Sequence, residues 1–288
     1  MTDGVRAMFL STLAFSLANV FVKQVSHLPP LEIVFFRCIL GTAFCFAGLY
    51  RAKADWLGSS RTLLLLRGAF GTLALFLFFT TLQNIPLASA MTIQYLAPLF
   101  TSIIAIFVLG EKVLPMQWIF YAAAFSGVIF IERFDPRISP LYLAIGIVSA
   151  VCSGVAYNLV RSLRGKEHPL TVVLHFQLFG AVAGLISLFF AWKMPSGWDW
   201  LWLVLVGVCS QLGQIFLTSA LQKEAVAGVA IINYSGLIYA LLIGSLVFGE
   251  FQSIETILGM LLVVAGVLAS IIYSKRRRDL EKIEFTVG

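Results

Sequence analysis

Long apolar runs alternate with short polar interruptions along the whole chain. An apolar run of about 20 residues is long enough for a helix to cross a bilayer. The interruptions carry the charged, Pro and turn-forming residues that are typical of loops. We therefore predict ten transmembrane helices, over residues 6–26, 32–50, 62–82, 87–109, 115–131, 140–161, 169–191, 200–221, 227–248 and 254–273.

Composition agrees with this pattern and excludes a soluble globular enzyme. Of 288 residues, 60% are hydrophobic and 12% are charged, whereas a soluble domain has about 25% charged residues. The runs are too uniformly apolar for the alternating strands of a membrane β-barrel. The predicted fold class is an all-α integral membrane protein, and ten spans leave no room for a domain outside the bilayer.

The distribution of Lys and Arg predicts the orientation, since cytoplasmic loops carry the excess of these residues. Outside the spans, fourteen lie on the side of the N-terminus and four on the opposite side, namely Lys23, Arg133, Arg137 and Lys193. Both termini are therefore expected in the cytoplasm, in a bacterial cytoplasmic (inner) membrane. The net charge of +6 reflects this topology, and nucleic acid is not an expected partner.

An internal repeat relates the two halves of the chain at a shift of 139 residues. Leu82–Ile131 aligns without a gap to Leu221–Ser270, with eleven identities in fifty positions. The matched positions include Tyr95 with Tyr234 and Gly127 with Gly266. We predict a first five-helix repeat over residues 1–137, a second over 138–274 and a basic cytoplasmic tail over 275–288.

Five spans is an odd number, so the second repeat must enter the membrane from the opposite side to the first. Two inverted five-helix repeats are the architecture of many secondary transporters, whose binding site lies near the midplane between the halves. Such halves can exchange conformations, which gives alternating access. The chain contains no G-x-x-x-x-G-K-[ST] phosphate loop, so no ATP-driven machinery of that kind is expected.

The repeat and its motifs carry a resemblance to a known family. The motif Gln94-Tyr95-Leu96-Ala97-Pro98-Leu99, the segment Leu109-Gly110-Glu111-Lys112 and the second Phe248-Gly249-Glu250 resemble the EamA branch of the drug/metabolite transporter superfamily, over nearly the whole chain. The resemblance implies a central cavity surrounded by the first four spans of each repeat, with the fifth and tenth spans peripheral. It does not indicate the substrate. The second half has Leu237 where the first has Pro98, so a shared Pro kink is not assumed.

Polar residues inside the spans are the candidate substrate-binding residues, because a polar group in hydrocarbon usually faces the bundle interior. Each has two interpretations, a hydrogen bond between helices or a place in the cavity wall. Pro98 is the candidate kink, since it frees the carbonyl of Gln94. The candidates are Asn19, Arg37, Gln94, Tyr95, Tyr157, Asn158, His175, Gln211, Gln214, Asn233 and Tyr234.

Charged residues inside the spans form a smaller group. For Arg37 and Arg67 the simpler interpretation is snorkelling of the guanidinium to the headgroups. The alternative is that Arg37 attracts an anionic or carboxylate-bearing substrate. Glu32 or His175 would then titrate during transport, which leaves protons open as coupling partners.

Two helix ends and the tail have structural interpretations. Gly110-Glu111 and Gly249-Glu250 are expected to end the fourth and ninth spans, because Gly fits a left-handed helix cap. Residues 275–278, Lys-Arg-Arg-Arg, are expected to anchor the cytoplasmic end of the last helix.

The function expected from the sequence is a secondary transporter, in the direction of export, for small organic solutes such as amino acids or related metabolites. The aspartates fall in loops or tails and no G-x-S-x-G elbow is present, so a membrane enzyme is not expected. A facilitative channel or a membrane scaffold without carrier activity stays as the alternative. All four cysteines lie in apolar runs, and no metal site or cofactor is expected. A small-molecule substrate and the lipid bilayer are the expected partners, and both a monomer and a homodimer remain open.

Overall fold

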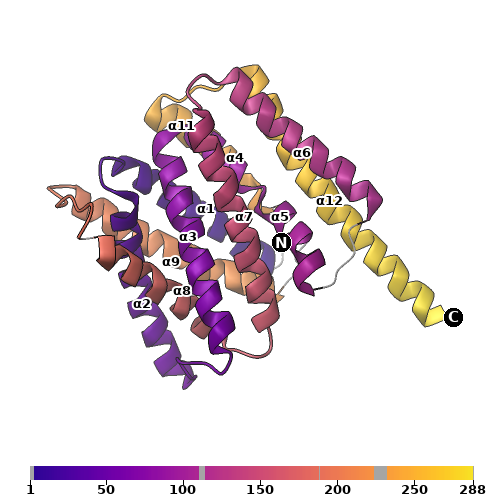
Figure 1. Ribbon diagram of the computed structural model, residues 1–288, viewed down its shortest axis with the longest axis horizontal. Coiled ribbons are helices and arrows are strands. Elements are labelled where there is room, and N and C mark those ends of the chain that lie inside the picture. The colour runs from indigo at the N-terminus through magenta and orange to yellow at the C-terminus, as the bar shows by residue number, and fades with distance from the viewer. Residues whose placement is uncertain (1–2, 110–113, 188, 224–231, 288) are drawn as a thin grey trace.

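The computed structural model describes residues 3–109, 114–187, 189–223 and 232–287. In these ranges the chain is built from helices joined by short connections (Figure 1). The helices are α1 (Asp3–Gln24), α2 (Pro30–Ala52), α3 (Arg61–Asn84), α4 (Leu87–Gln94), α5 (Ala97–Leu109), α6 (Pro115–Phe134), α7 (Pro140–Leu163), α8 (Pro169–Ser187), α9 (Asp199–Lys223), α11 (Ser235–Phe248) and α12 (Ile254–Val287).

The helices follow the predicted spans closely, and the prediction of an all-helical membrane protein is confirmed. Counting α4 and α5 as one run, eight of the described helical segments are long and apolar enough to cross a membrane. Pro30, Pro115 and Pro140 each stand at the start of a helix, where the missing N–H costs nothing because the first turn has no carbonyl to donate to.

Three predicted spans have different boundaries in the structure. Of the span predicted over 227–248, residues 227–231 lie outside the described residues and α11 begins only at Ser235. The span predicted over 87–109 is two helices, because α4 ends at Gln94 and α5 begins at Ala97. The last helix passes the predicted end at residue 273 and continues to Val287, so the basic residues 275–278 lie on an extension of α12.

The predicted helix cap at Gly249 is confirmed. Gly249 has a φ of 64° and ends α11 in the left-handed conformation, which glycine adopts without steric cost. The equivalent Gly110-Glu111 lies outside the described residues.

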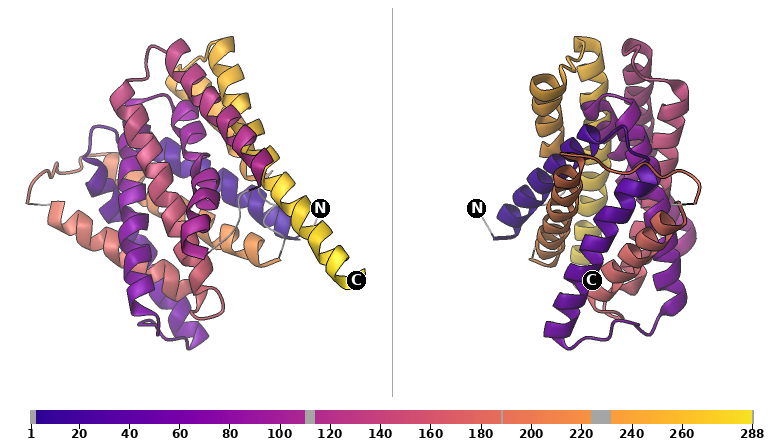
Figure 2. Two further views of the ribbon diagram at one scale, coloured as in Figure 1. Left: turned by 45° about the vertical axis from the view of Figure 1, so that its right-hand side comes forward. Right: turned by 90° about the vertical axis from the view of Figure 1, so that its left-hand side faces the viewer.

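The packing of the helices repeats itself under the 139-residue shift. α3 packs on α7 as α1 packs on α9, while α2 faces α8 and α6 runs along α12. The pair of α6 and α12 stands at one edge of the bundle in Figure 1 and in the left view of Figure 2, so the fifth and tenth spans are peripheral, as the resemblance implies.

Individual contacts show the same relation between the repeats. Gly127 of α6 approaches the backbone oxygen of Gly259, and Gly266 of α12 approaches the backbone oxygen of Phe120. Each contact becomes the other when 139 is added or subtracted, because 120 and 127 shift to 259 and 266. The two inverted repeats therefore pack about a local two-fold axis at α6 and α12.

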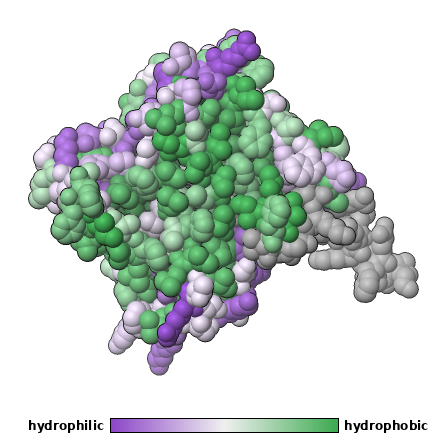
Figure 3. All heavy atoms as spheres, in the orientation of Figure 1, coloured by the Kyte–Doolittle hydropathy of each residue, from purple (hydrophilic) through white to green (hydrophobic). Residues whose placement is uncertain are grey.

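Polar residues gather at the two ends of the bundle and leave an apolar surface between them (Figure 3). At one end, called the Glu250 end, His27 pairs with Asp199 at 3.0 Å and Arg137 pairs with Asp135 at 2.8 Å. The other end, called the Glu167 end, carries the connections that follow α2 and α7.

At the Glu250 end, a cluster of contacts joins three segments, the end of α1, the connection from α3 to α4 and the connection after α11. Lys23 of α1 pairs with Glu250 after α11, and its Nζ also donates to the carbonyl of Ile85 at 3.0 Å. Glu250 in turn accepts the backbone N–H of Leu87 at 2.8 Å, at the start of α4. We call Lys23, Ile85, Leu87 and Glu250 the latch.

Candidate functional site

Two arginines lie close together in the interior of the bundle, at the boundary between the two repeats. Arg37 of α2 and Arg67 of α3 are 6% and 8% exposed. Their guanidinium carbons lie 5.6 and 4.8 Å from the ring centroid of Phe176 on α8. We call Arg37, Arg67 and Phe176 the arginine cluster, and it joins the first repeat to the second.

The expectation that these arginines snorkel is therefore wrong for both. A snorkelling side chain keeps its charged head in water, whereas both guanidinium groups lie inside the bundle and over an aromatic ring. Neither Nε nor Nη1 of either residue has a hydrogen-bond partner. Within the described ranges, the ion pairs lie at the Glu250 end and do not include these arginines.

Local sequence makes room for this arrangement. A side chain at Gly71, one turn after Arg67 on α3, would overlap Nη1 of Arg67 and come 2.9 Å from the ring of Phe176. Gly68 similarly allows the backbone of His175 to approach α3. Small residues at these positions let α3 and α8 pack closely and leave space for the guanidinium.

Tyr157 connects the arginine cluster to open space. It is close enough to Arg67 to interact electrostatically, and it follows Ser149 and Ser153 on one face of α7. Those serines are buried, but Tyr157 is 46% exposed. The face of α7 that packs against α4 therefore becomes accessible at Tyr157.

Tyr95 and Tyr234 meet beside this region at the interruptions of the fourth and ninth spans. Their rings are 4.7 Å apart in an edge-to-face arrangement. The hydroxyl of Tyr95 donates to the backbone oxygen of Asn233 at 3.2 Å, while the buried hydroxyl of Tyr234 has no partner. These tyrosines are repeat equivalents, so the contact lies where the two repeats meet.

The interruption has the same backbone geometry in both repeats. Tyr95 has φ −68° and ψ −4°, and Tyr234 has φ −72° and ψ −10°. Pro98 supplies no N–H to Gln94 in the first repeat, but Leu237 has one and donates to Tyr234 at 3.0 Å. Pro98 alone therefore does not explain the helix break, which occurs in the second repeat without proline.

Two of the predicted binding residues instead bridge helices. Gln94 donates to Ser153 at 2.8 Å and accepts from Ser149 at 3.0 Å. Asn158 donates to the backbone oxygen of Thr101 at 2.9 Å. These contacts tie the fourth span to α7, in agreement with the interhelical interpretation.

A second polar contact links α8 and α9. Gln177 donates to Gln211 at 3.3 Å, and the other oxygen of this pair, Oε1 of Gln177, has no partner. The amide of Gln177 lies against Gly41 of α2, one turn after Arg37, so this amide pair lies beside the arginine cluster along α2. Gln214, one turn after Gln211, is half-buried.

Three other predicted residues contribute no side chain to the contacts described above. Asn19 is 8% exposed on α1. His175 has Nδ1 2.9 Å from the backbone oxygen of Thr171, one turn earlier in its own helix. Asn233 contributes its backbone oxygen, not its amide, to the contact with Tyr95.

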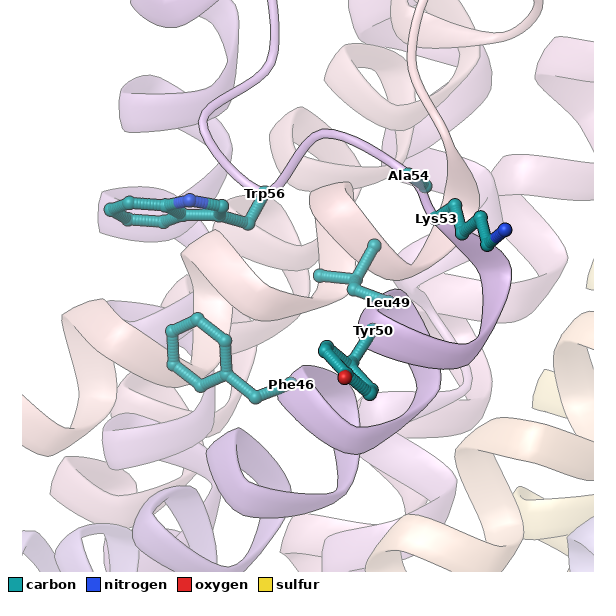
Figure 4. Close-up of a pocket in the computed structure, with 6 residues that line it drawn as sticks. All are labelled: Phe46, Leu49, Tyr50, Lys53, Ala54 and Trp56. Carbon is teal, nitrogen blue, oxygen red and sulfur yellow. The ribbon is translucent and has the colours of Figure 1, made fainter.

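A surface pocket lies at the Glu167 end, away from the arginine cluster. Phe46, Leu49, Tyr50, Lys53, Ala54 and Trp56 line it (Figure 4). Tyr50 is 87% exposed, and aromatic residues with lysine at the end of a span are typical of the membrane–water interface. The pocket is therefore assigned to the membrane interface.

Sequence reasoning missed Arg67, Phe176 and Gln177 as candidate site residues. Arg67 was visible as a charge inside a span, but its distance from the helix end favoured snorkelling. Phe176 and Gln177 carry no signal of their own among 25 phenylalanines and several in-span amides. Their role follows from the close packing of α2, α3 and α8.

Comparisons with known proteins agree with this fold. The model of the EamA-like transporter family matches residues 3–133 and 140–272. The pseudopaline exporter of Pseudomonas aeruginosa is 30% identical, over 93% of this chain and 96% of its own. Human solute carrier family 35 member G1 is also 30% identical, over 91% and 77%. The S-adenosylmethionine uptake transporter of Rickettsia felis is 25% identical, over 98% and 96%.

A solved crystal structure has the same fold. It superposes with a TM-score of 0.69 at 19% identity and covers 95% of this chain and 98% of its own. Two family matches, one on each five-helix half, and relatives aligned over nearly their full length show the relationship. This chain is a multi-pass membrane protein that belongs to the EamA-like transporter family.

Proposed function

We propose that this transporter is a secondary carrier that exports small organic solutes by alternating access, with the binding site between the two repeats. The observation that carries this proposal is the arginine cluster, where buried polar groups without partners lie on the boundary between the repeats. Carriers with inverted repeats bind their substrates at such a boundary near the midplane.

The relatives support the transport of small metabolites. One is named as a pseudopaline exporter and another as an S-adenosylmethionine uptake transporter, so their names differ in direction. Export is the proposed direction because the exporter is the more similar of these two. The excess of Lys and Arg supports a cytoplasmic location for both termini and for the Glu167 end, in a bacterial inner membrane.

Proton coupling is a second part of the proposal. Glu32 is fully buried, and its Oε2 accepts the backbone N–H of Lys193 at 3.1 Å while Oε1 has no partner. A buried carboxyl with a free oxygen can hold a proton in one transport state and release it in the other. In reconstituted protein, Glu32→Gln or His175→Gln should abolish the dependence of flux on a pH gradient, and an unchanged dependence in both variants would exclude these residues as coupling groups.

Counterflow in proteoliposomes tests the carrier function. Vesicles preloaded with an unlabelled metabolite should transiently accumulate the labelled metabolite, because a carrier exchanges bound solutes across the membrane. A library of metabolites screened with and without a pH gradient identifies the substrate and the coupling together. Flux without saturation or counterflow would indicate a channel, and no flux with any solute would favour a scaffold.

A further inference from the structure

We infer that the substrate carries an oxyanion, a carboxylate or a phosphate, that binds between Arg37 and Arg67 over the ring of Phe176. This inference rests on the transporter function proposed above and adds the chemical class of the substrate. It uses a residue, Arg67, that sequence patterns favour as a lipid-facing anchor.

The first argument is the free-energy cost of burying the two arginines without partners. A charged group inside a membrane protein is normally paired or hydrogen-bonded, because desolvation without compensation is expensive. Arg37 and Arg67 have Nε and Nη1 atoms that are both buried and unpartnered. Contact with the ring of Phe176 compensates part of this cost, and it leaves the Nε and Nη1 donors free.

The second argument is that the two charges share one location. Both guanidinium carbons are measured to the same ring, so they can be no further apart than the sum of 5.6 and 4.8 Å. They are close enough to repel each other electrostatically. Two cations held together without a counter-charge favour an anion that can bind both.

The third argument is the chemistry of the donors. A guanidinium group presents N–H donors in a planar fork that matches carboxylate and phosphate oxygens. Arg67 interacts electrostatically with Tyr157 and Arg37, and the described carboxylates that form ion pairs lie at the Glu250 end. The anion is therefore expected to come from the solute.

The fourth argument is access. Tyr157 lies near Arg67 and is 46% exposed, so the protein does not cover the arginine cluster completely on the side of α7. The buried Oε1 of Gln177, whose side chain lies against Gly41 one turn after Arg37, is an unused acceptor for a donor group on the same solute. The site would thus accept an organic acid that also carries a hydroxyl or amine.

The test uses purified full-length protein and matched pairs of probes. Succinate and glycerol 3-phosphate represent the two kinds of oxyanion, and succinamide and glycerol are their uncharged counterparts. Thermal unfolding in detergent reports binding, because a ligand of the native state raises the unfolding temperature with concentration. The variants are Arg37→Met and Arg67→Met, with Arg133→Gln as a control that removes one exposed arginine from the peripheral α6.

We expect an oxyanion probe to stabilise the wild type and the Arg133→Gln control, while the uncharged probes do not. Loss of hydrogen bonds to a charged group should weaken apparent affinity by roughly 10- to 150-fold in Arg37→Met and Arg67→Met. Without ligand, Arg67→Met should unfold at a temperature equal to or above that of the wild type, because an uncompensated charge is removed. A purely structural arginine would give a lower temperature.

Several results would overturn the inference. They are equal stabilisation by succinamide and succinate, wild-type affinity in both Met variants, or no stabilisation by any oxyanion probe. If either Met variant does not fold, Arg37→Lys and Arg67→Lys replace it, since they keep the charge and lose the fork; the same loss of affinity is expected.

Counterflow separates this inference from the proposed function. If neutral or cationic solutes show counterflow and oxyanions are neither bound nor transported, the carrier function is supported and the anion site is excluded. Oxyanion binding that depends on both arginines, in a protein without any flux, would retain the site and exclude the carrier.

Discussion

The guanidinium group of Arg67 occupies space that α3 leaves open at Gly71. A methyl group there would overlap Nη1 of Arg67 and would also come 2.9 Å from the ring of Phe176. The position of one charge in the arginine cluster thus depends on the absence of a single carbon atom nearby. This dependence gives a test that changes geometry and leaves the number of charges unaltered.

Gly71→Ala should weaken succinate binding while the protein still folds, because the guanidinium must leave the ring of Phe176. The measurement is the concentration of succinate that gives half of the maximal rise in unfolding temperature. Ala69→Val, on the exposed face of the same helix, is the control and should behave as the wild type. Unchanged affinity in Gly71→Ala would show that the guanidinium position does not matter.

Glu167 provides a residue-scale prediction outside the membrane. Its carboxylate accepts the backbone N–H groups of Ser60 and Ser59 and the hydroxyl of Ser59. These hydrogen bonds lower the pKa of Glu167 below its ordinary value of 4.5, and the bond from the backbone of Ser60 has the largest effect. They connect the segment after α2 to the segment after α7.

A lowered folded-state pKa means that the ionised carboxylate stabilises the fold above its ordinary pKa, and that this contribution is lost as pH falls through the folded-state value. Wild-type protein should therefore lose thermal stability between about pH 5 and about pH 3. The variant Glu167→Gln should be less stable than the wild type at neutral pH, and its unfolding temperature should fall less over this range. Lys166→Gln is the neighbouring control, expected to parallel the wild type. Parallel pH curves for wild type and Glu167→Gln would contradict the prediction.

At the scale of elements, the pairing of α6 with α12 shows the two-fold relation most directly. The sites of Gly127 and Gly266 each face a backbone oxygen, at 2.6 and 2.7 Å from the position a side chain would take. Backbone atoms cannot move aside as a flexible side chain can. The two glycines should therefore respond alike to substitution, although they lie 139 residues apart.

Gly127→Ala and Gly266→Ala should each destabilise the protein by about 1–3 kcal/mol, the usual cost of overpacking a close contact. Thermal unfolding of both variants, measured together, should give nearly equal losses. Ala122→Val, on the exposed face of α6, should change little. A large loss in one glycine variant with none in the other would contradict equivalent packing in the two repeats.

At the scale of the whole molecule, the contact between the two repeats at Tyr95 and Tyr234 is not symmetric in its hydrogen bonds. The hydroxyl of Tyr95 donates to Asn233, but the equivalent hydroxyl of Tyr234 has no partner. Under the 139-residue shift, the missing bond is from Tyr234 to the backbone oxygen of Gln94. If the repeats exchange conformations during transport, this bond should form in the alternate state, in which the latch is open.

Tyr95→Phe should then favour the alternate state and Tyr234→Phe the state described here, since one hydrogen bond contributes about 0.5–1.5 kcal/mol. Ser89→Cys, buried on α4 close to the latch, can report the difference in protein whose four native cysteines are replaced. A membrane-impermeant maleimide at the Glu250 end should label the cysteine faster with Tyr95→Phe and more slowly with Tyr234→Phe. Tyr50→Phe is the exposed control, and identical rates in all variants would count against the exchange.

Much of the fold could be predicted because membrane insertion depends on local sequence. Each span must satisfy its own backbone hydrogen bonds and present apolar side chains to lipid, so hydropathy alone indicates helices such as α3 and α7. The register of the repeat and the inverted topology follow from spacing and from the number of spans along the chain, and the cap at Gly249 follows from local sequence. The peripheral pair of α6 and α12 follows from the family resemblance.

The arrangement of the polar residues could not be predicted in the same way. The sequence around an amide side chain inside a span looks the same whether the amide bridges two helices, as that of Gln94 does, or faces a solute. No proline signals the helix break at Tyr234. The backbone oxygen of Asn233, which this break frees, is satisfied by the hydroxyl of Tyr95 from the other repeat, and a contact between repeats leaves no local sequence pattern.

The sequence by itself determined the membrane class, the helices and the two inverted repeats of this protein, because these depend on hydropathy and spacing along the chain. The tertiary structure decided which polar groups share a location. Arg37 and Arg67 belong to different helices, and Phe176 belongs to the other repeat. Their meeting depends on the packing of α2, α3 and α8, and distances between helices are not encoded by the period of any one of them.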